Sequence, residues 1–126
     1  MYNTHPSLLP LHRGWQPIFF SVLENTPIGI SIHQVNIGLD KGLLLCQEKI
    51  TIQPSETLKT LHTKCRLKLM EMVTIYWPQI LNNNQQLFPQ KSGGCYHNKK
   101  EFDLIFSKLN NGWNSSIEEI SKLKYK

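Results

Sequence analysis

The sequence is poor in cysteine and has no long apolar run. Its three cysteines, Cys46, Cys65 and Cys95, are far apart and form no C-x-x-C pair, which argues against a disulfide framework and against a zinc site. No apolar stretch approaches the roughly 18 residues that a membrane span requires. The sequence does not open with a charged segment followed by an apolar one. We therefore expect a protein of the reducing cytoplasm with no membrane partner.

Several functional signatures are also missing. There is no G-x-G-x-x-G, no P-loop and no G-x-S-x-G, so nucleotide binding through such loops and a serine nucleophile on an elbow are unsupported. His12, His33, His62 and His97 show no H-x-H or H-x-x-x-H spacing, which predicts no metal site. The net charge of +5 is small and spread along 126 residues. This charge argues for a solvated helix face and against a nucleic-acid partner.

The remaining pattern predicts an α/β chain. Pro17 suits the first turn of a short buried helix that runs to Glu24. Residues 28–35 alternate with the period of a strand, residues 36–42 form a glycine-bracketed loop, and residues 43–52 form a second strand. Residues 82–86 are an exposed turn, and residues 99–109 and 115–124 are two short helical segments.

The clearest predicted element is a long helix that begins after Pro54. Ser55 is the expected N-cap and Glu56 complements the helix dipole. Apolar residues recur at spacings of three and four and form one stripe: Leu58, Leu61, Cys65, Leu69, Met72, Tyr76 and Ile80. Pro78 lies inside this pattern and is expected to end or kink the last turn.

Three polar residues form a candidate catalytic set. Asn3 and His5 are two residues apart in an extended segment, so both side chains lie on one face. An amide and an imidazole on one face suit a carbonyl whose oxygen gains charge during a reaction. Asp40, in the loop after the strand, can orient His5 or hold a water that moves protons. The alternative is that both segments are ordinary turns, since Asn and Asp are common turn residues.

The residues that follow carry a family resemblance. Asn3-Thr-His-Pro-Ser-Leu-Leu-Pro10, then Arg13-Gly14 and Pro17, and later Leu39-Asp40-Lys-Gly42, resemble the signature of the folate-dependent formyltransferases. The resemblance runs from Asn3 to about Ile80. It implies the second part of a Rossmann-like formyltransferase fold, with residues 1–82 as the C-terminal portion of the catalytic domain and residues 83–126 as a truncated helical extension.

The resemblance also implies roles and a co-substrate. The family uses an Asn, a His and an Asp at the positions of Asn3, His5 and Asp40, with 10-formyltetrahydrofolate as formyl donor and no metal. Asn3 and His5 would stabilise the oxyanion, and Asp40 would orient His5 and shuttle a proton. Leu39 and Asp40 are the expected folate contacts. His33 is expected to support the site.

The substrate branch is indicated by the residues after Arg13. Trp15 and Gln16 make this segment similar to that of the nucleotide-sugar N-formyltransferases, which implies a role in polysaccharide or lipopolysaccharide O-antigen biosynthesis. The same two residues count against methionyl-tRNA formyltransferase. The resemblance implies substrate contacts from Arg13, Trp15, Tyr96, His97 and Lys99. For each an alternative stays open: Arg13 fixes the loop, Trp15 anchors the core, and the other three belong to a surface turn.

The sequence departs from the family in one large respect. In the family, about a hundred residues of strands and helices precede the Asn-x-His segment and supply much of the folate pocket. We expect that this half is absent and that the strand with Asn3 and His5 has an unpaired edge. Three explanations stay open: a truncated or split reading frame, a true start upstream of Met1, or a fragment that assembles with a partner carrying the first half. The isolated chain is then expected to be inactive or a non-catalytic remnant, unless a homodimer or a partner chain completes the fold.

Overall fold

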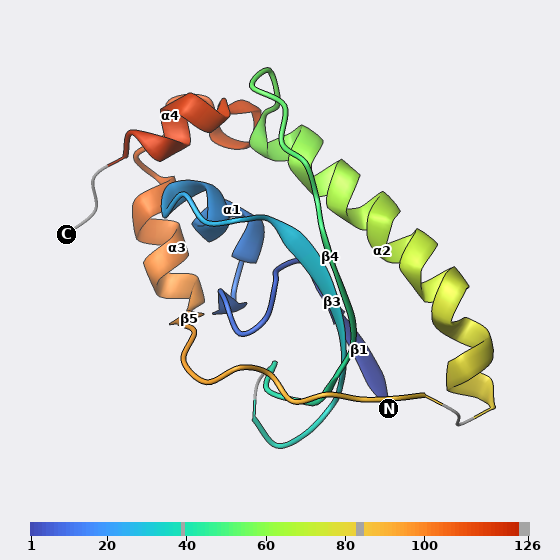
Figure 1. Ribbon diagram of the computed structural model, residues 1–126. Coiled ribbons are helices and arrows are strands. Elements are labelled where there is room, and N and C mark those ends of the chain that lie inside the picture. Colours follow the sequence, from blue (N-terminus) through green and yellow to red (C-terminus); the bar gives the residue numbers. More distant parts are fainter. Residues whose placement is uncertain (39, 83–84, 124–126) are drawn as a thin grey trace.

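The computed structural model describes residues 1–38, 40–82 and 85–123 (Figure 1). The strands are β1 (Tyr2–His5), β2 (Arg13–Gly14), β3 (Gly29–Gln34), β4 (Leu44–Lys49) and β5 (Tyr96–His97). The helices are α1 (Pro17–Leu23), α2 (Leu58–Leu81), α3 (Lys99–Phe106) and α4 (Ile117–Ser121), with a 3₁₀ turn, η1, at Gly112–Asn114. The predicted α/β character is confirmed, and the two long strands are shorter than their predicted ranges.

The sheet is an antiparallel meander with β3 in its centre. The strand order is β1-β3-β4, and Asn3 and His5 of β1 lie opposite His33 and Ser31 of β3. The first five of the six residues of β3 are buried, as expected of a strand covered on both faces. In the described part of the chain, β1 is paired on one side only, which agrees with the expected unpaired edge.

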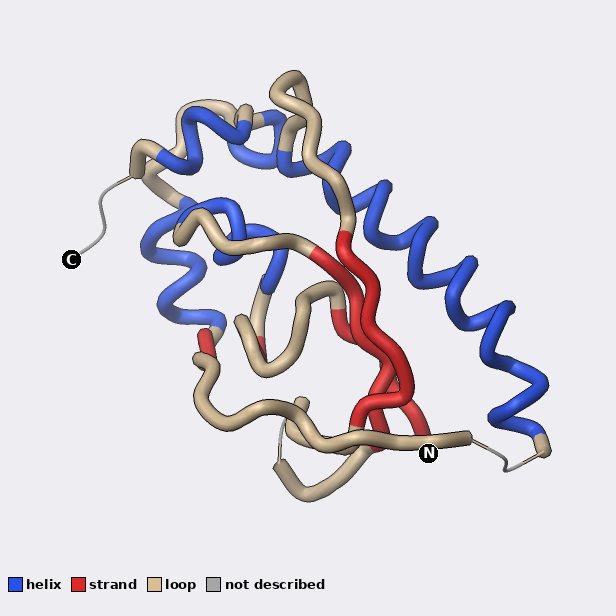
Figure 2. The backbone as a smooth tube through the Cα atoms, in the orientation of Figure 1, coloured by secondary structure: helices blue, strands red, loops and turns tan. Residues whose placement is uncertain are grey.

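Helices cover both faces of this sheet. In Figure 1, α2 runs along one face while α1 and α3 lie on the other, and Figure 2 shows the long irregular segments that join them. Phe19 and Phe20 of α1 are fully buried and meet Phe102 of α3 edge to face, a favourable arrangement for aromatic rings. These rings and the aliphatic residues of β3 form one continuous core.

Helix α2 begins two residues later than predicted. Thr57, not Ser55, is the N-cap: its hydroxyl accepts the Thr60 N–H, and Thr60 Oγ1 accepts the Thr57 N–H at 2.9 Å. This reciprocal pair satisfies two of the backbone donors that a helix start leaves open. The helix also continues past Pro78 to Leu81, so of the two predicted effects, an end or a kink, the end at Pro78 is wrong. Only three residues of the helix follow the proline, so the disturbance that proline causes is confined to the last turn.

The predicted apolar stripe of α2 is confirmed, but the helix also has apolar residues on its outer side. Leu58, Leu61, Cys65 and Met72 are buried. Exposed apolar side chains of the same helix are Leu67, Met70, Ile75, Trp77 and Leu81. Among the residues that the structure places, no helix combines the length and apolar character needed to cross a membrane.

The chain after α2 returns to the sheet. Phe88 forms a bridge with Leu44 at the start of β4, and β5 then pairs in parallel with β2. Figure 1 shows this segment passing the end of the sheet before it reaches α3. This return places residues near position 95 beside the loop that follows β1, which the sequence did not predict.

Candidate active site

His5 is the last residue of β1 and its side chain is buried. Its Nε2 lies 2.9 Å from the backbone oxygen of His12. Because a carbonyl oxygen can only accept, this contact places a hydrogen on Nε2. The other ring nitrogen, Nδ1, lies 3.4 Å from Oδ2 of Asp40. The structure therefore brings together two of the three predicted catalytic residues.

Asp40 is held in a fixed position by groups from two other segments. It has a positive φ of 56° in the loop between β3 and β4, an uncommon conformation for a residue other than glycine. Its Oδ2 accepts the backbone N–H of Gly14 at 3.0 Å, and its Oδ1 lies 3.4 Å from Nε2 of His33. The carboxylate is thus flanked by His5 on one oxygen and His33 on the other.

Burial and the charges in this cluster shift the pKa values of His5, His33 and Asp40. Burial lowers the pKa of His5, although the His12 carbonyl and Asp40 oppose this. The contact with Asp40 raises the pKa of His33, against the effect of its burial. Burial acts to raise the pKa of Asp40, but His33, His5 and the Gly14 N–H together bring it below its usual value. The site therefore holds an ionised carboxylate between two histidines of different basicity.

Asn3 lies two residues before His5 in β1, and the alternation of the strand puts both on one face. Its side chain is exposed, and Oδ1 accepts the Thr4 N–H at 2.9 Å. Leu39 lies outside the described residues. The strand geometry agrees with a shared role for Asn3 and His5, and their catalytic assignment stays a prediction.

Gln90 supports the loop that carries Asp40, and no sequence pattern predicted this role. Its Nε2 donates to the backbone oxygens of Asp40 and Gly42 at 2.7 and 3.0 Å. Its Oε1 accepts from Arg13 at 2.7 Å. Arg13 thus has the loop-fixing contact that was one of its two predicted roles.

The other predicted substrate residues lie in different environments. Trp15 and Tyr96 are 43% and 55% exposed, so Trp15 is not a core anchor. Lys99 forms an exposed ion pair with Asp103, one turn along α3. His97 is buried and its ring stacks on Phe20 at 3.7 Å. Trp15, Tyr96 and Lys99 are therefore exposed, whereas His97 is enclosed in the protein.

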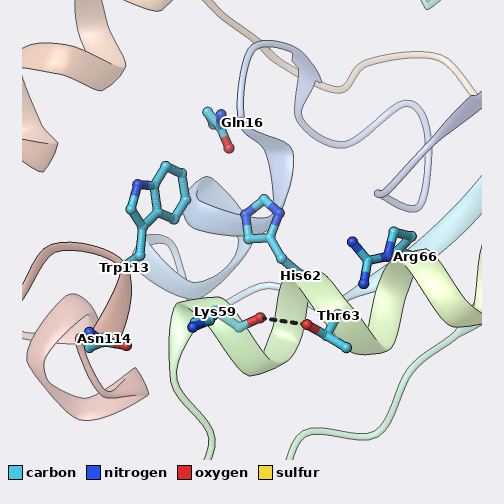
Figure 3. Close-up of a pocket in the computed structure, with 7 residues that line it drawn as sticks. All are labelled: Gln16, Lys59, His62, Thr63, Arg66, Trp113 and Asn114. Carbon is cyan, nitrogen blue, oxygen red and sulfur yellow. Dashed lines mark hydrogen bonds between the residues drawn. The ribbon is translucent and has the colours of Figure 1, made fainter.

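A separate pocket of about 730 Å³ lies away from His5. Figure 3 shows that Lys59, His62 and Arg66 come from α2, with the side chains of Trp113 and Gln16 facing them from other segments. The His62 and Trp113 rings meet edge to face at 5.3 Å, and burial lowers the pKa of His62. Two cations and an aromatic ring suit an anionic ligand, and none of the predicted site residues lines this pocket.

The chain is similar to enzymes that transfer formyl groups. Residues 1–74 match the family model described as formyl transferase. A methionyl-tRNA formyltransferase from a Wolbachia of Drosophila simulans is 38% identical over 83% of this chain and 35% of its own length. A dTDP-4-amino-4,6-dideoxyglucose formyltransferase from Mycobacterium tuberculosis is 25% identical over 82% of this chain and 44% of its own length.

Solved structures show the same fold. The formyltransferase PseJ from Anoxybacillus kamchatkensis, in complex with UDP-4,6-dideoxy-4-formamido-L-AltNAc and tetrahydrofolate, is 31% identical with a TM-score of 0.92. The match covers 98% of this chain and 66% of that one. The chain spans about a third to under a half of the length of the curated relatives described above. The sequence resemblance, the family model and the shared fold agree, and the chain belongs to the formyl transferase family.

Proposed function

We propose that this chain carries the catalytic part of an N-formyltransferase that moves a formyl group from 10-formyltetrahydrofolate to the amino group of a nucleotide-linked amino sugar. The observation that carries the proposal is the 3.4 Å distance between Nδ1 of His5 and Oδ2 of Asp40. His5 belongs to strand β1, which also contains Asn3. The similarity to PseJ, which is in complex with a formamido sugar nucleotide and tetrahydrofolate, supports this donor and this acceptor class.

The reaction forms one bond and breaks another at the formyl carbon. The substrate amine attacks that carbon, and the formyl oxygen becomes an oxyanion for which the Asn3 amide is the proposed donor. The bond from carbon to N10 of the folate then breaks, and N10 takes up a proton. The products are a formamide and tetrahydrofolate.

His5 and Asp40 are proposed to manage the proton that the amine loses. With the hydrogen of His5 on Nε2, the lone pair of the neutral ring is on Nδ1, beside Asp40. A proton that arrives from the amine, directly or through water, is stabilised there by the carboxylate. The imidazolium that forms in turn stabilises the neighbouring oxyanion by its charge. His33 acts by positioning Asp40.

The sugar branch is supported by Trp15 and Tyr96, since exposed aromatic rings suit a sugar or a base. A methionyl-tRNA acceptor is the second candidate, and the 38% identity to such an enzyme favours it. A non-catalytic partner subunit is the third, because the chain spans only 66% of the PseJ chain.

Turnover assays separate these candidates. The purified chain is incubated with 10-formyltetrahydrofolate and, in separate reactions, with nucleotide-linked 4-amino sugars or charged initiator tRNA, and released tetrahydrofolate is measured. We expect release with a sugar, a loss of at least about 100-fold in His5→Ala, and no loss in Leu104→Ala, a control at an exposed residue outside the cluster. Release with the tRNA alone selects the second candidate. No folate binding and no turnover with any acceptor would refute a catalytic role for this chain.

A further inference from the structure

Three residues that are far apart in the sequence bring potential metal ligands together. The Nδ1 of His12, the Sγ of Cys95 and the Nε2 of His97 all lie within 4.8 Å of one another. His12 Nδ1 is 3.1 Å from His97 Nε2 and 3.5 Å from Cys95 Sγ. Both histidines are buried and the cysteine is half-buried. The convergence joins the loop after β1 to strand β5, which the parallel pairing of β2 and β5 holds in register.

Glu24, the residue after α1, supplies a fourth atom to this group. Its Oε2 lies 3.1 Å from Nε2 of His97 and 3.6 Å from Nδ1 of His12. Tetrahedral zinc has bonds of about 2.0–2.1 Å to nitrogen and oxygen and about 2.3 Å to sulfur, so its ligand atoms are roughly 3.3–3.6 Å apart. The measured separations of 3.1, 3.5 and 3.6 Å are close to this range.

The opposite ring nitrogens have partners of their own. His97 Nδ1 lies 3.0 and 3.1 Å from the two carboxylate oxygens of Glu101, which can only accept, so Nδ1 carries the hydrogen. His12 Nε2 lies 2.7 Å from Thr26 Oγ1, and that hydroxyl lies 3.5 Å from the backbone oxygen of Ser21, so a Thr26 hydroxyl that donates to Ser21 accepts the N–H of His12 Nε2. Both neutral rings are then left with a lone pair on the inward nitrogen. A ring N–H given to a carboxylate or a hydroxyl is the usual support of a metal-binding histidine.

In this tautomeric arrangement, the two inward lone pairs need a positive charge between them. His12 Nδ1 and His97 Nε2 face each other at 3.1 Å, and a carboxylate oxygen of Glu24 is beside both. Acceptors at such separations repel one another unless a proton or a cation lies among them. Cys95 next to the pair favours the cation, because a thiolate is a strong ligand for borderline metals.

We propose that His12, Cys95 and His97, with Glu24 as fourth ligand, bind one divalent transition-metal ion of the zinc class. Cys sulfur, His nitrogen and carboxylate oxygen are all zinc ligands, and four protein ligands with no open position are characteristic of a structural site. The ion would fasten the loop after β1 to β5 and to the end of α1. Since the carbonyl of His12 accepts from His5, the ion would also hold the backbone group that orients the proposed catalytic histidine.

The proposal departs from the expectation drawn from sequence spacing. Short H-x-H and C-x-x-C motifs were absent, but 83 residues separate His12 from Cys95 in the sequence, and only the fold brings them together. The proposal does not depend on the acceptor or on turnover, because its readouts are metal content and a spectrum.

Metal content and cobalt spectra test the site on the full chain. The chain is stripped with a chelator, incubated with Zn²⁺, separated from free ion, and its metal content measured by mass spectrometry; we expect one ion per chain. Replacement by Co²⁺ should give the visible absorption of a tetrahedral site together with a thiolate-to-cobalt charge-transfer band in the near ultraviolet. No retained metal, or a cobalt spectrum without the charge-transfer band, would overturn the proposal and leave a shared proton between the two rings as the explanation.

Variants identify the ligands. Cys95→Ser should lose the charge-transfer band, and Cys95→Ser and Glu24→Gln should each weaken zinc binding by about tenfold or more. His62→Gln and Cys46→Ala are matched controls outside the cluster and should retain one ion per chain. Zinc binding that is unchanged in Cys95→Ser and in Glu24→Gln would contradict this ligand set. The spectrum of the unsubstituted chain decides the case even where a variant does not fold.

Discussion

Replacement of Asp40 by asparagine isolates the charge at the centre of the candidate site. Asparagine has nearly the same shape and can still accept the Gly14 N–H that Asp40 Oδ2 accepts at 3.0 Å. The variant loses the charge that faces His33 at 3.4 Å and His5 at 3.4 Å. Any difference between the two proteins therefore reports the electrostatic part of these contacts.

The expected effect depends on pH, and its sign follows from the two pKa directions. Because the pKa of His33 is raised in the folded protein, this residue contributes stability that is fully present below the pKa it has in the unfolded chain. That stability is lost as the pH rises through its pKa in the folded protein. Because the pKa of Asp40 is lowered in the folded protein, this residue contributes stability that is present above the pKa it has in the unfolded chain. That stability is lost as the pH falls through its pKa in the folded protein. The pair is therefore strongest in mildly acidic solution, between the two folded pKa values.

The size of the effect follows from burial. Both side chains are almost inaccessible, with 3% of His33 and 7% of Asp40 exposed. Removal of one partner from a buried ion pair costs about 3–5 kcal/mol, and the retained Gly14 hydrogen bond places our expectation near the lower end, at about 3 kcal/mol near pH 5.5. Near pH 8.5 a smaller share of His33 is charged, so the loss should be smaller, at about 1 kcal/mol, since the Gly14 hydrogen bond is retained in both proteins.

Urea denaturation at the two pH values measures this difference. With a slope of about 2 kcal/mol/M, the midpoint should fall by roughly 1.5 M at pH 5.5 and by about 0.5 M at pH 8.5. Asp103→Asn is the control, because Asp103 is in an exposed ion pair and should change stability by less than about 1 kcal/mol. An equal loss at both pH values for Asp40→Asn would refute the reasoning, as would an NMR titration in which the midpoint of His33 does not fall.

Three further substitutions test the fold around the site. Gly14→Ala should destabilise by more than about 2 kcal/mol because its new Cβ would lie 2.2 Å from a backbone oxygen. Gly93 has a similar φ but open space around an added Cβ, so Gly93→Ala should lower the free energy of unfolding by only about 1 kcal/mol. Equal losses of stability for the two variants in thermal melts would contradict this reasoning. Phe19→Ala should cost about 3–5 kcal/mol by urea denaturation, against less than about 0.5 kcal/mol for the exposed Leu104→Ala; a similar loss in both would contradict the packing. Gln90→Ala removes two hydrogen bonds to the Asp40 loop and should lower any turnover at least about tenfold without changing the pH dependence, and unchanged turnover would exclude this positioning role.

The sequence predicted the local elements because their signals are local. Pro17 at the start of a helix, the alternation in β3 and the stripe of α2 each depend on neighbours within a few residues. Boundaries were less predictable, since Ser55 and Thr57 are both good caps and only the contact with Thr60 selects between them. The formyltransferase family was also predictable, because its signature consists of short segments whose residues and order are read directly along the chain.

What the sequence alone determined, then, was the family and the placement of Asn3 and His5, two residues of the candidate set, on one strand. The approach of Asp40 to His5 at 3.4 Å was expected from the resemblance but measured only in the fold. The brace from Gln90, the charge contact with His33, and the convergence of His12, Cys95 and His97 were decided by tertiary structure alone. The physical reason is that these contacts join segments up to 85 residues apart, and separation along a chain carries no information about distance until packing fixes it.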